Sequence, residues 1–211
     1  EGMPLAVRAA GSKDGFGRAV DIPHCLDLSN LSGITAYEPN ELYMTALAAT
    51  PIAEIKAALR QNNQQMAFEP PDLGVLYGNR GGTIGGAIAC NLAGPRRIQA
   101  GAARDHFLGF NAVSGRGEVF KSGGTVVKNV TGFDLSKLLA GSFGTLAVMS
   151  RVTFKVMPVG EKTRTVLALG LDDAQAMTAM AAAMGSSNEV SGAAHLPPDA
   201  AARSGVSHVS G

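Results

Sequence analysis

The chain has 211 residues, of which 45% are apolar, 17% charged and 5% aromatic, a globular composition that excludes wholesale disorder. Its 18 basic and 17 acidic side chains leave a net charge of +1, which argues against a protein built to grip nucleic-acid phosphates. No apolar run approaches the roughly 20 residues of a membrane-spanning helix. Two distant cysteines exclude a disulfide framework or a zinc ribbon, and the four histidines show no metal-ligand spacing.

In chain order, hydrophobic periodicity and turn residues predict strands that come in neighbouring runs, with helices between them. Strands are expected at residues 5–9, 34–38, 42–48, 66–68, 107–114, 118–121, 145–156 and 163–171. Helices are expected from a Thr50 cap to residues 62–63, and at 84–93, 134–140 and 172–184. This order favours an α+β fold with mixed or antiparallel sheets over a regular parallel βαβ series.

Glycine is over-represented, with 27 of 211 residues, about 13% against a usual level of about 7%. The glycines gather in a first loop at residues 11–17, in a second region at 78–101 and in a turn at 141–144. The patterns GxxxxGK[ST], GxGxxG and GxSxG are absent, which disfavours a Walker site, a Rossmann fold and a hydrolase nucleophile. Several separate glycine loops indicate an elongated ligand approached closely by backbone, and flavin adenine dinucleotide (FAD) fits that demand.

A series of motifs then carries a family resemblance. The motifs are GSK at 11–13, FEPPD at 68–72, GTIGG at 82–86, NLAGPRR at 91–97, GAARDH at 101–106, KNVTGFDL at 128–135 and GSFGTL at 141–146. In this order they resemble the FAD-binding E subunits of glycolate oxidases, within the vanillyl-alcohol-oxidase/PCMH flavoprotein superfamily. The resemblance covers roughly residues 5–196, and it is specific as a set.

The resemblance implies a PCMH-type FAD-binding domain of two α+β lobes over residues 1–160, with its first βα unit missing. Residues 161–211 would be the beginning of an incomplete α+β cap domain. FAD is expected to bind without a covalent bond, because no histidine stands in the first loop, and no metal site is expected. The cofactor-binding residues implied are Gly11, Ser12, Lys13, Asp14, Gly15, Pro71, Gly82, Thr83, Gly85, Gly86, Asn91, Ala93, Gly94, Arg96, Gly101, Ala103, Ala147 and Val148.

Individual residues keep alternative interpretations. Lys13 would neutralise the pyrophosphate or be a solvated loop charge, and Arg96 would clamp flavin or substrate or form a surface ion pair. Asp105 is better interpreted as ordering the Gly101 turn than as a group near the flavin, and Asp134 as a helix N-cap rather than an acid. No catalytic residue can be assigned.

By resemblance, the chain is an FAD-dependent oxidoreductase component of a glycolate oxidase or dehydrogenase complex that oxidises a small 2-hydroxy acid. The alternatives are a non-catalytic FAD-binding electron-relay or scaffolding subunit, and a structural protein whose glycine loops are empty. The expected partners are a sister flavoprotein and an iron–sulfur subunit, without nucleic acid or a transmembrane segment. The expected location is the cytoplasm, with peripheral attachment to the inner membrane through partners left open.

Overall fold

The computed structural model describes residues 2–18, 21–74, 81–125 and 132–205. The motif residues 128–131, and residues 78–80 of the second glycine region, lie outside this part of the chain. The chain divides into two compact units, residues 1–94 with 101–159 and residues 95–100 with 160–211.

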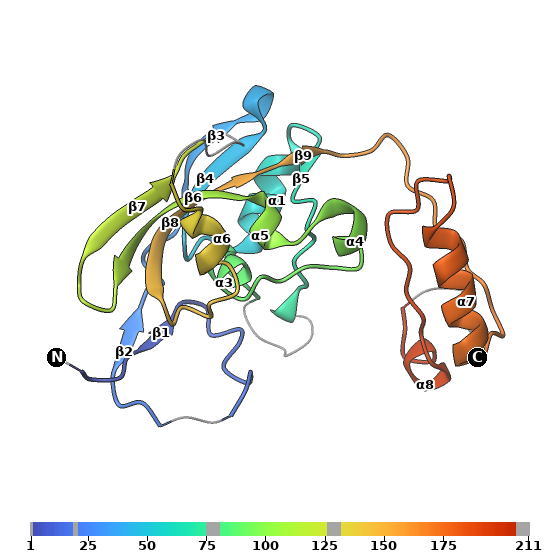
Figure 1. Cartoon of the computed structure of the whole chain (residues 1–211), viewed down its shortest axis with the longest axis horizontal. Coiled ribbons are helices and arrows are strands. Elements are labelled where there is room, and N and C mark those ends of the chain that lie inside the picture. The colour runs from blue at the N-terminus through green and yellow to red at the C-terminus, as the bar shows by residue number, and fades with distance from the viewer. Residues whose placement is uncertain (1, 19–20, 75–80, 126–131, 206–211) are drawn as a thin grey trace. The chain divides into compact units, whose positions relative to one another are not determined.

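A five-stranded antiparallel sheet forms the centre of the first unit (Figure 1). Its strands run in the order β3 (Ile34–Glu38), β4 (Tyr43–Leu47), β8 (Ala147–Lys155), β6 (Phe107–Ser114) and β7 (Val119–Gly123). Neighbouring strands are antiparallel throughout, so the predicted α+β class is confirmed.

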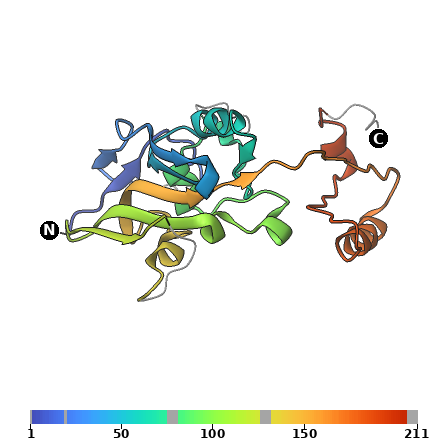
Figure 2. The ribbon, with the colours of Figure 1, turned by 90° about the horizontal axis from the view of Figure 1, so that it is seen from above.

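The buried core lies between this sheet and short helices. In β8, Val152 and Phe154 are fully buried and alternate with partly exposed residues, as expected for a strand with one covered face. The first unit contains the helices α1 (Ile52–Arg60), α3 (Ile84–Ala89), α5 (Ala103–His106) and α6 (Leu135–Leu139), and the 3-10 helix η1 (Pro39–Glu41). Helix α3 contacts β4 and β8, and α6 contacts β6 and β7 (Figure 2).

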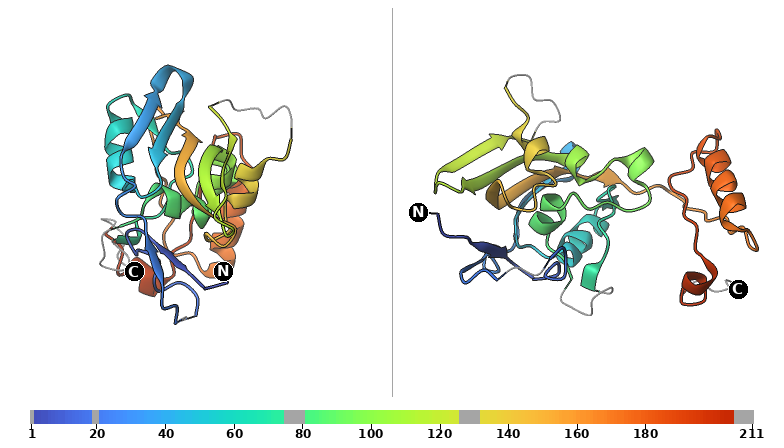
Figure 3. Two further views of the ribbon diagram at one scale, coloured as in Figure 1. Left: turned by 90° about the vertical axis from the view of Figure 1, so that its left-hand side faces the viewer. Right: turned by 60° about the horizontal axis from the view of Figure 1, so that its bottom comes forward.

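Two further strand pairs complete the first unit. β1 (Ala6–Arg8) and β2 (Cys25–Asp27) are parallel and are joined by the first glycine loop, whereas β5 (Gln64–Gln65) and β9 (Met157–Pro158) are antiparallel. In the right-hand view of Figure 3, the β1–β2 pair and α3 lie on the same side of the five-stranded sheet. The fold thereby brings the first glycine loop toward α3.

The sequence predicts Thr50 as the N-cap of α1, and this prediction is wrong. The N-cap is Pro51, which has no side-chain capping bond. The Thr50 hydroxyl instead donates to Leu47 O at 2.7 Å and accepts from Gly33 N at 2.9 Å. Its side chain is fully buried, so it joins the β3–β4 region to the start of the helix.

Two predicted strands are wrong, and two helices are shorter than predicted. Residues 66–68 form a turn directly after β5, and their apolar side chains enter the core from it. Residues 163–171 are exposed and have no partner strand among the described residues, and a strand without a hydrogen-bonded neighbour does not form. Helix α3 ends at Ala89 because Asn91 turns into the left-handed region at φ 50°, and α1 ends at Arg60.

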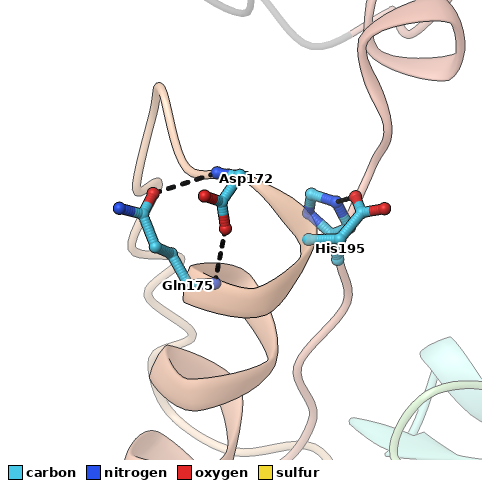
Figure 4. Close-up of polar contacts among 4 residues, drawn as sticks. Asp172, Gln175 and His195 are labelled. Atoms are coloured by element: carbon cyan, nitrogen blue, oxygen red, sulfur yellow. Dashed lines mark hydrogen bonds and ion pairs between the residues drawn. The ribbon is translucent and has the colours of Figure 1, made fainter.

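The second unit is formed by α4 (Arg97–Ala100), α7 (Asp173–Met184) and α8 (Pro198–Ala201). Asp172 and Gln175 form a reciprocal capping box at the start of α7, with bonds of 2.8 and 3.1 Å (Figure 4). Asp173 is the first residue of α7, and its Oδ1 lies 2.8 Å from Nε2 of His195, which stands between α7 and α8 in the chain (Figure 4). No described helix in either unit is long and apolar enough to span a bilayer.

Candidate functional site

A pocket of about 280 Å³ lies in the first unit, where three segments distant in the sequence converge. One wall comes from β1 and the loop that follows it, a second from α3, and a third from the turn before β8 and the start of that strand. Each of the three segments contains or adjoins one of the glycine-rich stretches identified in the sequence. The fold brings these segments into one site.

The first wall is a tight loop that presents its backbone amides. Gly11 has a φ of 69°, and a side chain there would come within 2.8 Å of the Arg8 guanidinium. Arg8 forms an ion pair with Asp14 across this loop. The N–H groups of Gly11, Ser12, Lys13 and Gly15 have no hydrogen-bond partner in the described parts of the chain, and Ser12 is only 5% exposed. Clustered free amides of this kind suit an anionic ligand.

Lys13 supplies the positive charge of the pocket. Its Nζ lies 3.2 Å from Ser12 Oγ, and none of the described carboxylates forms an ion pair with it. Burial lowers the pKa of Lys13, an effect that the nearby Cys90 opposes. A desolvated ammonium without an acidic partner is unfavourable on its own, so this site would be stabilised by a bound anion.

The second wall contains the start of α3, which is anchored by the protein itself. Ile84 N donates to Thr50 O at 3.0 Å, Gly85 N to Ala48 O at 2.8 Å, and the Thr83 hydroxyl accepts from Gly86 N at 3.3 Å. The amides at this helix end are therefore already used, and they are not free to bind a ligand.

The glycines of this wall differ in what they accommodate. A side chain at Gly85 would come within 2.7 Å of both Cβ and O of Ala48, so packing against β4 requires this glycine. A side chain at Gly86 would instead come within 2.8 Å of Lys13 Nζ, and one at Gly82 within 3.9 Å of that atom. Gly86 thus leaves the space that the Lys13 ammonium occupies.

The third wall is set by an irregularity in the sheet. The pairing of β6 with β8 shifts between Asn111 and Ala112, so that Ser150 of β8 faces no partner across this ladder. Such a bulge bends the strand locally, and the three residues before Ser150 (147–149) line the pocket. Phe143 and Gly144 of the preceding turn complete the wall.

The structure brings together half of the residues that the sequence implies for the cofactor. Those lining the pocket are Gly11, Ser12, Lys13, Asp14, Thr83, Gly85, Gly86, Ala147 and Val148. Gly15 lies in the same loop, and Gly82 lies within reach of Lys13, but neither lines the pocket.

The remaining implied residues, Pro71, Asn91, Ala93, Gly94, Arg96, Gly101 and Ala103, do not line this pocket. Several of them have structural contacts. Asn91 Oδ1 accepts from Arg104 N at 2.8 Å, and Gly94 N donates to Phe68 O at 3.0 Å. Arg96 belongs to the second unit. A contact between these residues and the cofactor stays a prediction.

Asp105 and Asp134 have the structural roles that the sequence favours. Asp105 Oδ2 accepts from Ala102 N at 2.8 Å, next to Gly101, whose φ is 83°. Asp134 is the N-cap of α6 and accepts from Lys137 N at 3.2 Å. Neither carboxylate lines the pocket.

Sequence reasoning missed several pocket residues, among them Arg8, Phe16, Cys90 and Phe143. Cys90 lies four residues after Gly86, one helical turn along α3, so helical spacing alone could have placed it on the same face. Phe143 stands inside a turn that the sequence does predict. Its proximity to the first loop is long-range, so no local signal could have shown it.

The residues present fit one part of FAD. Free amides and the Lys13 ammonium suit a pyrophosphate, and Val7, Leu28 and Val148 add apolar surface beside them. The pocket volume of about 280 Å³ lies near the lower limit of roughly 300 Å³ for small-molecule sites. The pocket would therefore hold part of this elongated ligand. The described residues contain no group of three or more His, Cys, Asp or Glu side chains placed to hold a metal ion.

Comparison with known proteins places the chain in a family. A family model described as "FAD binding domain" matches residues 1–123. Glycolate oxidase subunit GlcE of Escherichia coli is 43% identical over 155 residues, covering 74% of this chain and 43% of that protein. Glycolate oxidase subunit GlcD of Bacillus subtilis is 38% identical over 102 residues, covering 48% of this chain and 21% of that protein. The chain thus spans less than half the length of these relatives.

A solved structure, that of alkyldihydroxyacetonephosphate synthase, matches with a TM-score of 0.57 at 17% identity, covering 75% of this chain and 28% of that one. At this identity the likeness concerns the fold alone, which agrees with the predicted PCMH-type class. The family model covers more than half of the 211 residues, and the lining of the pocket fits one part of FAD. The chain belongs to the FAD binding domain family of PCMH-type flavoproteins, and its cofactor is FAD.

Proposed function

We propose that this chain is the FAD-binding subunit of a glycolate oxidase- or dehydrogenase-type complex that oxidises a small 2-hydroxy acid. The observation that carries the proposal is the pocket itself, where the first glycine loop, Lys13 and the start of β8 converge. Within the described residues, the amides of Gly11, Ser12, Lys13 and Gly15 have no hydrogen-bond partner, and no carboxylate forms an ion pair with Lys13. The similarity to GlcE over 74% of the chain supports this substrate class.

In the proposed complex, the Gly11–Gly15 loop and the Lys13 ammonium hold the pyrophosphate of FAD. Thr83, Gly85, Gly86, Ala147 and Val148 form the adjoining walls, which exclude water from the bound part. Bound FAD supplies the capacity to accept a hydride from the carbon that bears the hydroxyl group. The chain's own part is to bind and orient it.

Binding is non-covalent in this proposal, since no histidine lines the pocket among the described residues. Acid precipitation of the loaded protein is therefore expected to leave all flavin absorbance in the supernatant. Flavin that stays with the precipitated chain would contradict this, and a Cys90→Ser variant would then show whether the pocket thiol is the point of attachment.

A second candidate is a non-catalytic subunit that binds FAD to relay electrons or to stabilise the complex. One observation favours it. Asp14 is the one carboxylate that lines the pocket in the described parts of the chain, and it is paired with Arg8. A general base next to the cofactor would have to come from elsewhere.

Anaerobic reduction by glycolate distinguishes the two candidates. The proposal expects flavin bleaching when glycolate is added to the FAD-loaded chain, alone or with co-expressed flavoprotein and iron–sulfur partner subunits. If this chain is catalytic, its bound flavin is still bleached by glycolate when the partner flavoprotein in the complex is inactivated. If it is a relay subunit, its flavin is then no longer bleached. Absence of bleaching under every condition would exclude glycolate as substrate. The proposed site of action is the cytoplasm, with any attachment to a membrane made through the partners.

A further inference from the structure

Phe143 adopts a backbone conformation that its residue type disfavours. Its φ is 55°, in the left-handed region where a side chain is strained, and its side chain is 62% exposed. Gly141 and Gly144 on either side also have positive φ values, of 86° and 75°, but glycine adopts these without strain. The sequence thus places a bulky aromatic residue where a third glycine would form the same turn more easily.

The surrounding turn holds Phe143 in this conformation. Its N–H donates to Ala89 O of α3 at 2.8 Å. The Thr145 hydroxyl donates to Ser142 O at 2.6 Å, and Ser142 N donates to Leu139 O at 3.1 Å. These bonds fix the backbone without any use of the phenyl ring.

The ring is not part of the folded core. Phe143 is absent from the cluster of buried apolar side chains, although most of the protein's phenylalanines in the described segments belong to that cluster or pack against it. It does line the pocket, as Phe16 does, together with Ala147 and Val148. Neither backbone preference nor core packing explains an aromatic residue at this position, so we attribute it to a role in the pocket.

We propose that Phe143 is a stacking platform for a planar heteroaromatic ring of FAD. The proposal rests on the FAD pocket described above and deepens it by naming a residue that binds a ring. An exposed phenyl group on a fixed turn offers a flat apolar face at little cost in side-chain entropy. The Gly11–Gly15 loop and Lys13 would hold the neighbouring pyrophosphate.

The test compares substitutions at Phe143 with one at Phe133, which is 90% exposed but does not line the pocket. FAD affinity of the full chain is measured by calorimetry, and thermal unfolding is measured without FAD. Phe143→Ala is expected to weaken FAD binding about tenfold, the effect of losing one stacked ring, while Phe143→Tyr and Phe133→Ala stay within about twofold of wild type.

Phe143→Gly separates binding from folding. Glycine relieves the positive φ, so this variant is expected to unfold at the same or a higher temperature than Phe143→Ala while it binds FAD just as weakly. Wild-type affinity in Phe143→Ala would overturn the proposal. Failure of the wild-type chain to bind FAD would instead contradict the cofactor site as a whole, so the two failures are distinguishable.

Two fragments of the cofactor identify the ring. If Phe143→Ala weakens ADP binding and leaves FMN binding unchanged, the stacked ring is adenine. The opposite pattern identifies the isoalloxazine. Unchanged binding of both fragments, or an equal loss for both together with a lower unfolding temperature, would overturn the stacking role.

Discussion

Replacing Lys13 by methionine tests the electrostatic basis of the site. The change keeps an unbranched side chain of similar length and removes the ammonium, which lies 3.2 Å from Ser12 Oγ without a carboxylate partner among the described residues. A hydrogen bond to a charged group contributes about 1.5–3 kcal/mol, so FAD affinity is expected to fall about 10- to 150-fold. The fold of the free protein should not suffer, because a desolvated and unpaired charge is removed.

Calorimetric titration of FAD into Lys13→Met and wild type measures this loss. Lys121→Met is the matched control, since Lys121 is exposed on β7 and does not line the pocket. Equal FAD affinity in Lys13→Met and wild type would refute the assignment of Lys13 to the pyrophosphate. A large fall in the unfolding temperature of free Lys13→Met would refute the argument that the ammonium is unfavourable without a ligand.

Three further predictions follow from the same site. Burial lowers the pKa of Lys13 in the folded chain below its ordinary value of 10.5, so between the folded and unfolded pKa values the unfolded chain binds more protons. The stability of the free protein should therefore rise with pH across that window, while FAD affinity falls because the ammonium is lost. Both trends should be absent in Lys13→Met, and a pH-independent FAD affinity in wild type would contradict the prediction. Gly85→Val places a branched side chain within 2.7 Å of Ala48 and should lower the free energy of unfolding by about 1–3 kcal/mol in chemical denaturation. The control Gly15→Ala has no atom within 4 Å of its new Cβ and should stay within about 0.5 kcal/mol of wild type. Equal effects of the two substitutions would contradict the packing role of Gly85. Cys90 lines the pocket and Cys25 does not, so a Cys25→Ser variant leaves Cys90 as the thiol to be followed. FAD at 100 times its Kd should slow the alkylation of Cys90 by N-ethylmaleimide about 100-fold. An alkylation rate unchanged by FAD would place the cofactor elsewhere.

Local sequence signals predicted the elements whose stabilisation is local. β6 has the predicted bounds of residues 107–114, because its strand propensity ends at a Gly115–Gly117 turn. Helix α7 begins after Asp172 as predicted, since its capping box lies within four residues. Residues 163–171 have the same strand propensity but lack a described neighbour, so propensity alone gave the wrong result.

The candidate site also contains residues that local sequence signals predict and residues that only long-range folding brings together. The first loop was predicted from its glycines, and its place beside α3 was implied by the family resemblance and not by local pattern. The family resemblance implies a cofactor contact for Gly85, and the fold adds a packing requirement against Ala48 that no local pattern shows. Phe143 is not predicted as a pocket residue because only long-range folding brings it to the pocket, whereas the helical spacing of Cys90 from Gly86 is a local signal that could have placed it there.

Hydrogen–deuterium exchange of the full chain with and without FAD tests the central claim most directly, because it locates the bound cofactor. Saturating FAD is predicted to slow amide exchange in three segments together, residues 10–16, 82–90 and 142–149, which contain most of the pocket lining. The free amides of the first loop should show the largest change, because they have no partner within the described chain until a ligand binds. Exchange in these segments that is unchanged by saturating FAD, or protection confined to other segments, would contradict the site.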